Sequence, residues 1–382
     1  MNELEIQRKK IDQIDKQLLP LFLERMECSK AVADYKRANG VAVLDKNREK
    51  EILDSKMAMA EPHSRTAVRD FFSSIMSISR GYQNMLLGDK APSLEWSFCE
   101  GELISRPTAV FQGVAGANSE TALMKLFGAN CNRINVMTFA EVLDAVSEGR
   151  ADYGVIPLEN SLTGSISGVY DLLEKQEFYI VGEADVRIKH CLLAHPDAEL
   201  GDIRVVYSHQ QGYLQCREFF KDHPQIEFRE YHNTAMAAKL VAGMDDKGCA
   251  AISDPRCAEI YGLRVLADNI SMGRGNVTRF GAVAKKGVLN PRCNKVSIMF
   301  TLPNESGALS CILSEFAVNN LNLVKIESRP GHGCGFEYIF FADFEGNLLD
   351  PVVQRVMETV AGITTSMRIL GNYTKPKEHS NE

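Results

Sequence analysis

The chain has 382 residues and a mass of 42.4 kDa, which is too long for one ordinary domain, so two or three domains are expected. Apolar residues make up 45% and charged residues 24% of the chain, which is typical of a globular enzyme and excludes a disordered chain. The net charge of −7 lacks the basic character that a nucleic-acid partner requires.

Cysteine usage and the N-terminal segment indicate where such a protein works. The ten cysteines are scattered without a CxxC pair, and a chain of this length needs no disulfides to fold. The first ten residues, MNELEIQRKK, are charged and lack the apolar segment of a signal peptide. No run of 18 apolar residues exists that could span a membrane. We therefore expect a cytoplasmic protein with no membrane partner.

Residues 1–88 are predicted to form an all-helical domain, because apolar residues recur there three and four positions apart. One helical stripe carries Arg8, Arg25 and Lys36 among its apolar residues, so these cations are expected to line a polar pocket. Arg25 and Lys36 are about 16 Å apart along a helix and can share one small ligand. Arg8 is about 42 Å from Lys36 on the same scale, so it is expected to serve the equivalent site of a partner subunit.

Further polar residues follow at matching positions. Asp45 is expected to cap the next helix, and Ser79 and Gln83 lie four positions apart on one face of a later helix. With the cations named above, and with Arg48 and Glu49, they resemble the all-helical chorismate mutases, which are intertwined dimers. The resemblance implies a pericyclic rearrangement of chorismate to prephenate, which needs no cofactor and relies on orientation and electrostatic stabilisation.

The resemblance also implies roles for these residues. Arg8 of the partner and Arg25 would bind the two carboxylates of chorismate, because a guanidinium can bond both oxygens of a carboxylate. Lys36 and Gln83 would act as the catalytic donors to the ether oxygen, while the acidic residues and the neighbourhood of Arg48 would hold the hydroxyl. Pro20 departs from a regular helix and is expected to kink it. The implied substrate-binding set is Arg8, Arg25, Lys36, Asp45, Arg48, Glu49, Ser79 and Gln83.

Residues 88–107 break the helical period and contain two prolines and the only tryptophan, Trp96. We interpret residues 89–107 as a linker. The alternative is a lid that packs on one of its neighbours.

In residues 108–286, short apolar runs alternate with helical stretches, which predicts α/β layers around a largely parallel sheet. A glycine-containing loop precedes a helix expected to start near Asn118 or Ser119, and its backbone N–H groups could bind an anion, although a plain tight turn fits as well. Polar residues then follow two strand ends, at 159–161 and 208–216, where α/β sheets place ligands, and a third polar segment, 276–280, lies between a glycine-rich turn and an apolar strand.

These three segments, with Gly164, Asp171 and the sequence HCLL at 190–193, resemble the prephenate dehydratases. The resemblance implies two α/β lobes with a cleft between them, like a periplasmic binding protein. It implies conversion of prephenate to phenylpyruvate with loss of water and carbon dioxide.

Within this resemblance, Thr278 would donate a hydrogen bond or a proton to the leaving hydroxyl, and Arg279 would position a carboxylate or the cleft wall. Glu159 is a candidate catalytic acid if burial raises its pKa. No metal site is expected, because His190, Cys191 and His195 lack an acidic ligand cluster. The expected substrate-binding set is Asn160, Ser161, Ser208, Gln215, Asn276, Thr278, Arg279 and Phe280.

Residues 294–373 show a βαββαβ order, which is the ferredoxin-like arrangement. Segments 307–309 and 327–330 resemble the ACT domain of prephenate dehydratases, which implies feedback inhibition by L-phenylalanine at a subunit interface. The implied effector residues are Gly307, Ala308, Leu309, Glu327, Ser328, Arg329 and Pro330. Residues 374–382 are expected to form a polar tail.

The sequence as a whole predicts a multidomain α + α/β + α+β protein: a phenylalanine-regulated, bifunctional chorismate mutase and prephenate dehydratase that forms a homodimer or a higher homo-oligomer. One alternative is a small-molecule sensor fused to a helical oligomerising domain. Another is a dehydratase that has a degenerate mutase domain or prefers arogenate.

Overall fold

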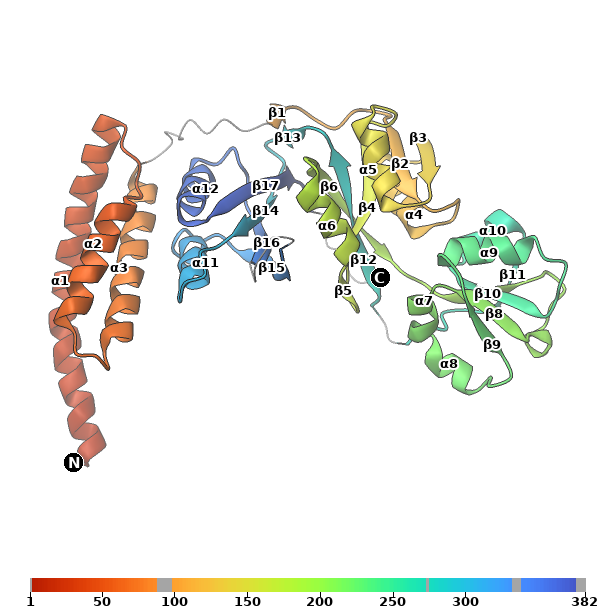
Figure 1. The fold of residues 1–382 in the computed structure, drawn as a ribbon, viewed down its shortest axis with the longest axis horizontal. Coiled ribbons are helices and arrows are strands. Elements are labelled where there is room, and N and C mark those ends of the chain that lie inside the picture. The colour runs from red at the N-terminus through yellow and green to blue at the C-terminus, as the bar shows by residue number, and fades with distance from the viewer. Residues whose placement is uncertain (1, 88–97, 273–274, 332–337, 376–382) are drawn as a thin grey trace. The chain divides into compact units, whose positions relative to one another are not determined.

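The structure, a computed structural model, describes residues 2–87, 98–272, 275–331 and 338–375 (Figure 1). Residues 89–97 of the predicted linker, with Trp96, and residues 376–382 of the predicted tail lie outside the described residues. The chain forms two compact units, one of Met1–Trp96 with Cys293–Leu370 and one of Ser97–Arg292 with Gly371–Glu382.

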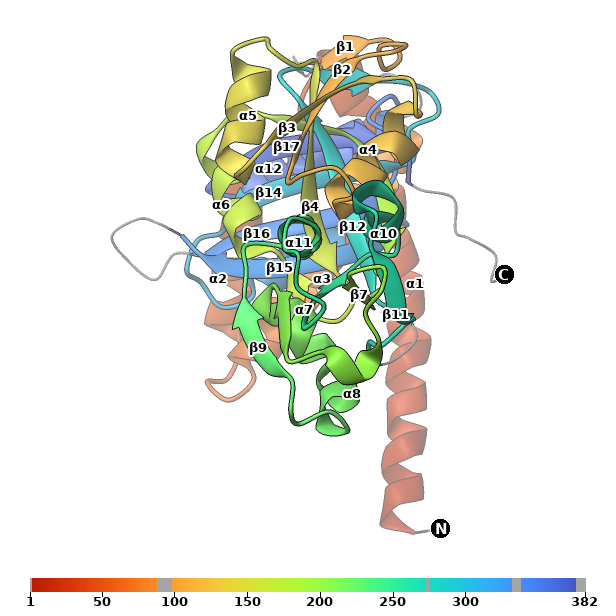
Figure 2. The ribbon, with the colours of Figure 1, turned by 90° about the vertical axis from the view of Figure 1, so that its right-hand side faces the viewer.

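The first unit begins with three helices, α1 (Glu3–Asn39), α2 (Lys46–Met59) and α3 (Arg65–Leu86). The side chain of Asn2 caps α1, and Gly40 ends it with a left-handed φ of 65°. Helix α1 runs unbroken through Pro20, so the expected kink does not interrupt it. Both α1 and α2 pack on α3, and α1 extends well beyond them toward its N-terminus (Figures 1 and 2).

The remainder of the first unit has the βαββαβ order that the sequence predicts. Its elements are β14 (Lys295–Thr301), α11 (Ala308–Val318), β15 (Leu323–Pro330), β16 (Tyr338–Glu345), α12 (Pro351–Ile363) and β17 (Ser366–Tyr373). The strands lie in the order β15, β16, β14, β17. Helix α11 packs Phe316 against Phe344 of β16, with ring centroids 5.0 Å apart, so the helices and the sheet share one apolar core.

The second unit is divided into two lobes, each built on one sheet. The first-lobe sheet has the strand order β6, β12, β4, β2, β3, with the short β5 beside β4. Its elements are β2 (Thr108–Gln112), α4 (Asn118–Phe127), β3 (Asn132–Val136), α5 (Phe139–Ser147), β4 (Tyr153–Asn160), β5 (Gly164–Ser165), α6 (Ser167–Lys175), β6 (Tyr179–Arg187) and β12 (Val277–Ala284).

The second lobe is inserted between β6 and β12. Its strands lie in the order β11, β7, β10, β8, β9. Its elements are β7 (Cys191–Ala194), the 3₁₀ helix η1 (Leu200–Asp202), β8 (Val205–Ser208), α7 (Gln210–Gln215), α8 (Arg217–Lys221), β9 (Glu227–Glu230), α9 (Thr234–Ala242), β10 (Cys249–Ser253), α10 (Arg256–Tyr261) and β11 (Arg264–Ala267).

The prediction of a largely parallel sheet is wrong. Strand β2 is parallel to β3 and β4, but β12 is antiparallel to both β4 and β6. The reason is the insertion, because the chain leaves the first lobe through β6 and returns through β12 in the opposite direction. The two crossing strands therefore lie side by side, and the backbone N–H of Ile188 donates to the carbonyl of Asn276 at 2.8 Å.

The linker prediction is wrong for residues 98–107. Strand β1 (Phe98–Glu100) pairs in parallel with β13 (Gly287–Leu289), and Leu103 packs against the core of the first lobe. The N–H of Ile104 donates to the hydroxyl of Tyr153 at 3.0 Å. Residues 98–104 thus pair and pack with the domain that follows, as in the alternative considered above, although Ile104 itself is exposed. None of the described helices combines the length and the apolar character needed to span a bilayer.

Candidate active sites

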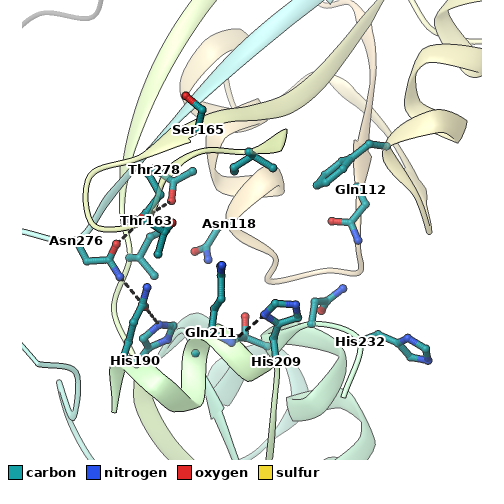
Figure 3. A pocket seen from close by; sticks show the side chains of 18 residues that line it. Gln112, Asn118, Thr163, Ser165, His190, His209, Gln211, His232, Asn276 and Thr278 are labelled. Atoms are coloured by element: carbon teal, nitrogen blue, oxygen red, sulfur yellow. Dashed lines mark hydrogen bonds between the residues drawn. The ribbon is translucent and has the colours of Figure 1, made fainter. Parts of the chain in front are cut away.

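A cavity of about 650 Å³ lies between the two lobes of the second unit (Figure 3). In the close view, Thr278 and Asn118 of the first lobe face Gln211 and His209 of the second. The lining side chains are mostly amides, hydroxyls and imidazoles. They are Gln112, Asn118, Phe139, Asn160, Thr163, Ser165, Ile166, Ile188, His190, His209, Gln211, Gly212, Gln215, His232, Asn233, Thr234, Asn276 and Thr278.

The electrostatics of this cavity suit an anion, although no lysine or arginine stands among the described residues that line it. Helices α4 and α9 both begin there, at Asn118 and Thr234, and helix N-termini stabilise negative charge. Two polar atoms at these helix starts, Oδ1 of Asn118 and Nδ2 of Asn233, are buried and have no hydrogen-bond partner within the described part of the chain. The site therefore offers polar groups that a ligand can satisfy.

A chain of side-chain hydrogen bonds runs across the base of the cavity. Asn160 Nδ2 donates to Asn276 Oδ1 at 2.7 Å, and Asn276 Nδ2 donates to Gln215 Oε1 at 2.8 Å. The same Gln215 oxygen lies 2.8 Å from His190 Nε2. Since that oxygen can only accept, His190 must carry its proton on Nε2. These hydrogen bonds thus fix four segments relative to one another: the end of β4, the start of β12, the segment before β7 and the end of α7.

Thr278 stands at the end of this series of hydrogen bonds, and its hydroxyl is the group that can act on a ligand. Asn160 Nδ2 also donates to Thr278 Oγ1 at 2.9 Å, so the Thr278 oxygen serves as an acceptor there. A hydroxyl that accepts from an amide keeps its own hydrogen free to donate elsewhere. Thr278 lines the cavity, so this hydrogen is available to a ligand.

Sequence reasoning did not place His190 in the site. Its side chain is buried, its Nδ1 has no partner among the described residues, and burial lowers its pKa, so the imidazole is neutral at pH 7. The sequence feature that could have identified His190 is its position directly before the buried strand CLLA, because a buried polar residue there needs a hydrogen-bond partner.

The neighbouring thiol belongs to a different environment. Cys191 Sγ donates to Asp268 Oδ1 at 3.0 Å, and burial raises the pKa of Cys191 to about 12. The thiol therefore stays protonated, and His190 and Cys191 do not act as a pair. No group of histidine, cysteine, aspartate or glutamate side chains arranged to hold a metal ion occurs among the described residues.

Several predicted dehydratase residues do not reach the cavity. Successive residues of a strand point to opposite faces, so Asn160 and Thr278 face the cavity while Glu159 and Arg279 face away from it. Arg279 forms an ion pair with Glu159, and its Nε lies 3.4 Å from Asp185. The structure therefore places Glu159 and Arg279 in an ion-pair cluster outside the cavity lining, which corrects the expected roles of Glu159 as an acid and of Arg279 at a substrate carboxylate or the cleft wall.

Three further residues of the predicted set support the cavity without lining it. Phe280 is part of the apolar core, and Ser161 bridges the backbone of Gly275 and Val277. Ser208 is fully buried and lies under α7, where a Cβ on Gly212 would come within 2.8 Å of its Oγ. Asn160, Gln215, Asn276 and Thr278 are the predicted residues that line the cavity.

In the first unit, the three helices bring a second predicted set together. Arg25 donates to Ser79 Oγ and to the carbonyl of Ile75 across the α1–α3 contact.

Lys36 lies near the start of α2. It donates to the carbonyl of Val43, and the carboxylates of Asp45 and Glu49 act on its charge. Both cations are half-buried, and burial lowers the pKa of Arg25 and of Lys36.

Other members of this set differ in position. Asp45 caps α2 by accepting from the N–H of Arg48, as predicted, while the Arg48 side chain forms an exposed ion pair with Glu51. Gln83 is buried, and its Oε1 has no partner among the described residues. Arg8 is exposed near the start of α1, far along the helix from Lys36. The described contacts of one chain thus bring together Arg25 with Ser79 and Lys36 with Asp45 and Glu49, but not Arg8 or the side chain of Arg48.

The residues predicted to bind an effector lie at one end of the β14–β17 sheet. Thr301 pairs with Ile339, which pairs on its other side with Arg329, so the ends of β14 and β15 are in register. Gly307, the residue before α11, follows β14 through a short loop and has a φ of 89°, which favours glycine. Glu327 accepts from Lys325 at 3.5 Å on the same strand.

Two family models match the sequence, the one described as chorismate mutase type II over residues 7–84 and the one described as prephenate dehydratase over residues 109–288. A bifunctional chorismate mutase/prephenate dehydratase of Buchnera aphidicola is 30% identical, over 98% of this chain and 97% of its own length. An arogenate dehydratase/prephenate dehydratase of Arabidopsis thaliana is 36% identical, over 70% of this chain and 73% of its own length.

Among solved structures, the prephenate dehydratase of Arthrobacter aurescens in complex with L-Phe matches with a TM-score of 0.64. It is 34% identical, and the match covers 70% of this chain and 90% of that one.

Proposed function

This chain belongs to the bifunctional chorismate mutase/prephenate dehydratases, and from its two sites we infer how it catalyses both steps, chorismate to prephenate and prephenate to phenylpyruvate. The observation that carries the dehydratase assignment is the chain of hydrogen bonds that ends at Thr278 in the interlobe cavity.

For the dehydratase step, Thr278 donates a hydrogen bond to the hydroxyl of prephenate as its C–O bond breaks. The ring carboxylate leaves as carbon dioxide, its bonding electron pair completes the aromatic ring, and the departing hydroxide takes up a proton to become water. Asn160 fixes the Thr278 oxygen so that its hydrogen points at the leaving group. The N-termini of α4 and α9 offset the negative charge of the substrate.

For the mutase step, Arg25 binds a carboxylate of chorismate, and Lys36 and Gln83 donate to the ether oxygen as negative charge develops on it. The rearrangement breaks that C–O bond and forms a C–C bond within one molecule, so no proton is transferred. The protein contributes orientation and a preorganised cationic environment. Ser79 orients Arg25, and Asp45 and Glu49 hold the substrate hydroxyl.

Two copies of the chain complete the mutase sites by pairing their α1 helices. The support is the exposed apolar surface of α1, where Leu4, Ile11, Ile14 and Leu21 are each more than half exposed. Exposed apolar surface of this kind indicates a protein partner. In such a pair, Arg8 of one copy would bind the second carboxylate at the site of the other.

L-Phenylalanine is proposed as the feedback effector, bound between Gly307–Leu309 and Glu327–Pro330. Support comes from the common sheet end that these segments share and from the L-Phe complex of the Arthrobacter aurescens relative. If phenylalanine weakens prephenate binding, prephenate must weaken phenylalanine binding by the same factor.

The test is to give the purified full chain chorismate without any cofactor and to follow prephenate and phenylpyruvate with and without L-phenylalanine. Phenylpyruvate that forms from chorismate and is suppressed by phenylalanine supports all three assignments. Prephenate that accumulates without phenylpyruvate would refute the dehydratase assignment. If chorismate is untouched while supplied prephenate is converted, the mutase assignment fails.

A further inference from the structure

A buried ion-pair cluster joins the mutase helix α3 to helix α11. The side chain of Glu315 on α11 is 0% exposed and that of Arg80 on α3 is 6% exposed. One carboxylate oxygen of Glu315 accepts from Arg80 Nε at 3.0 Å, from Arg80 Nη2 and from Ser77 Oγ at 2.9 Å. Ser77 and Arg80 are three positions apart, so both donors stand on one face of α3.

The packing around this cluster is close. A Cβ on Gly81 would come within 2.8 Å of Val318 Cγ2 on α11. Glycine inside a helix is unfavourable relative to alanine, so its presence in α3 is explained by the close approach of α11. A buried carboxylate likewise needs a buried cation to be tolerated. The contact between α3 and α11 therefore explains three residues: Gly81 and Arg80 on α3, and Glu315 on α11.

The other end of the Arg80 guanidinium reaches the mutase site. Its Nη1 forms an ion pair with Glu49 of α2, the residue assigned to the hydroxyl of chorismate. Burial would lower the pKa of Arg80, but the carboxylates of Glu315 and Glu49 outweigh burial and raise it above the usual value. Arg80 is thus permanently charged and shared between two acids.

We propose that Glu315 is a positioning residue for the mutase reaction. It holds the Nε and Nη2 edge of the Arg80 guanidinium, which leaves Nη1 for Glu49 and so fixes the Glu49 carboxylate where the substrate hydroxyl can reach it. Without Glu315, the Arg80 guanidinium can turn wholly toward Glu49. It would then draw the Glu49 carboxylate away from the substrate. A residue more than two hundred positions downstream, outside the mutase helices, thereby completes the mutase site. This inference rests on the proposed role of Glu49.

The test compares Glu315→Gln with Ser77→Ala in the full chain. Because Glu49 binds the hydroxyl in both the ground state and the transition state, Glu315→Gln should raise the KM for chorismate about tenfold with kcat nearly unchanged. Ser77→Ala removes a neutral donor to the same carboxylate but keeps the Arg80–Glu315 pair, so its KM should stay close to the unaltered value. Far-UV circular dichroism and the melting temperature report whether each variant is folded.

An unchanged KM in Glu315→Gln would overturn the proposal. So would an equal effect of the two variants, or a fall in kcat alone, because either result describes a merely structural contact. If Glu315→Gln does not fold, Glu315→Asp decides: it keeps the charge but moves the carboxylate, so its KM should rise to a smaller extent, and no change refutes the proposal. Lys36→Ala, made in parallel, distinguishes failure of the Glu315 proposal from failure of the proposed mutase site. Mutase activity that survives Lys36→Ala would refute the proposed site itself.

Discussion

The two catalytic sites are assembled in different ways. The dehydratase cavity takes all its described lining from one chain, and its polar side chains hold one another in a hydrogen-bonded series from His190 to Thr278. The mutase site takes its cations from one long helix whose N-terminal half is exposed, and Arg8 is out of reach of Lys36. Strand ends that meet at one sheet edge can complete a site locally, whereas a straight helix spreads its residues, which is why we propose that a second copy completes the mutase site.

The largest effect is expected from a substitution at Thr278. Thr278→Ala removes the hydroxyl that would donate to the leaving group, and we expect conversion of prephenate to slow by roughly 10² to 10⁴. Thr278→Ser keeps the hydroxyl and the bond from Asn160, so it should retain most of the rate. Chorismate consumption should be the same in all three proteins. If the alanine variant forms phenylpyruvate at a near-normal rate, Thr278 has no part in the chemistry.

Lys36→Ala tests the other site with a somewhat smaller effect. Loss of one preorganised donor to a developing charge costs roughly 10² to 10³ in rate, so chorismate should be rearranged that much more slowly. Conversion of supplied prephenate should be unaffected, because it takes place in the other compact unit. The exposed Lys30 on the same helix gives a matched control, since Lys30→Ala removes a charge outside the assigned set. Parallel loss of both activities would show that the two sites are not independent.

The same contrast decides how much of each site could be predicted from the sequence. Motifs at strand ends located the dehydratase cavity, and strand alternation alone implies that Asn160 and Glu159 point to opposite faces. The packing of the two lobes decides which face of the strand borders the cavity. The residues of the motif do not carry that information. Arg279 was misassigned for the same reason, because its partners Glu159 and Asp185 are on neighbouring strands that are distant in sequence.

The helical domain was more readable, because side chains at fixed helical spacing share a face whatever the surroundings. Spacing on one helical stripe singled out Arg25 and Lys36, and the capping position of Asp45 was predicted, whereas the site roles of Ser79 and Asp45 came only from the resemblance to the chorismate mutases. Arg80 could not, because nothing in the sequence of α3 pairs it with Glu315. The antiparallel crossing of β6 and β12 was missed as well, since a strand's direction depends on a lobe inserted more than eighty residues long.

His190 provides the smallest and sharpest test of the preformed dehydratase site. Its pKa is lowered by burial, so the folded protein holds the imidazole neutral. In an unfolded chain histidine titrates near 6.5, so at lower pH the unfolded state binds a proton that the folded state resists. The stabilisation is therefore complete above about pH 6.5 and is lost as the pH falls through the lower folded pKa.

His190→Gln removes this titration while leaving an amide that can donate to Gln215. Thermal unfolding should show the melting temperature of the unaltered chain falling by a few degrees more than that of the variant between pH 7.5 and pH 5.5. Asp254, whose own pKa is raised by burial and whose charge acts on His190, is present in both proteins, so its contribution largely cancels in the difference. Equal slopes would mean that the folded cavity accepts the proton readily. In that case His190 is not held as a neutral donor, and the hydrogen-bonded series that orients Thr278 is not fixed before the substrate binds.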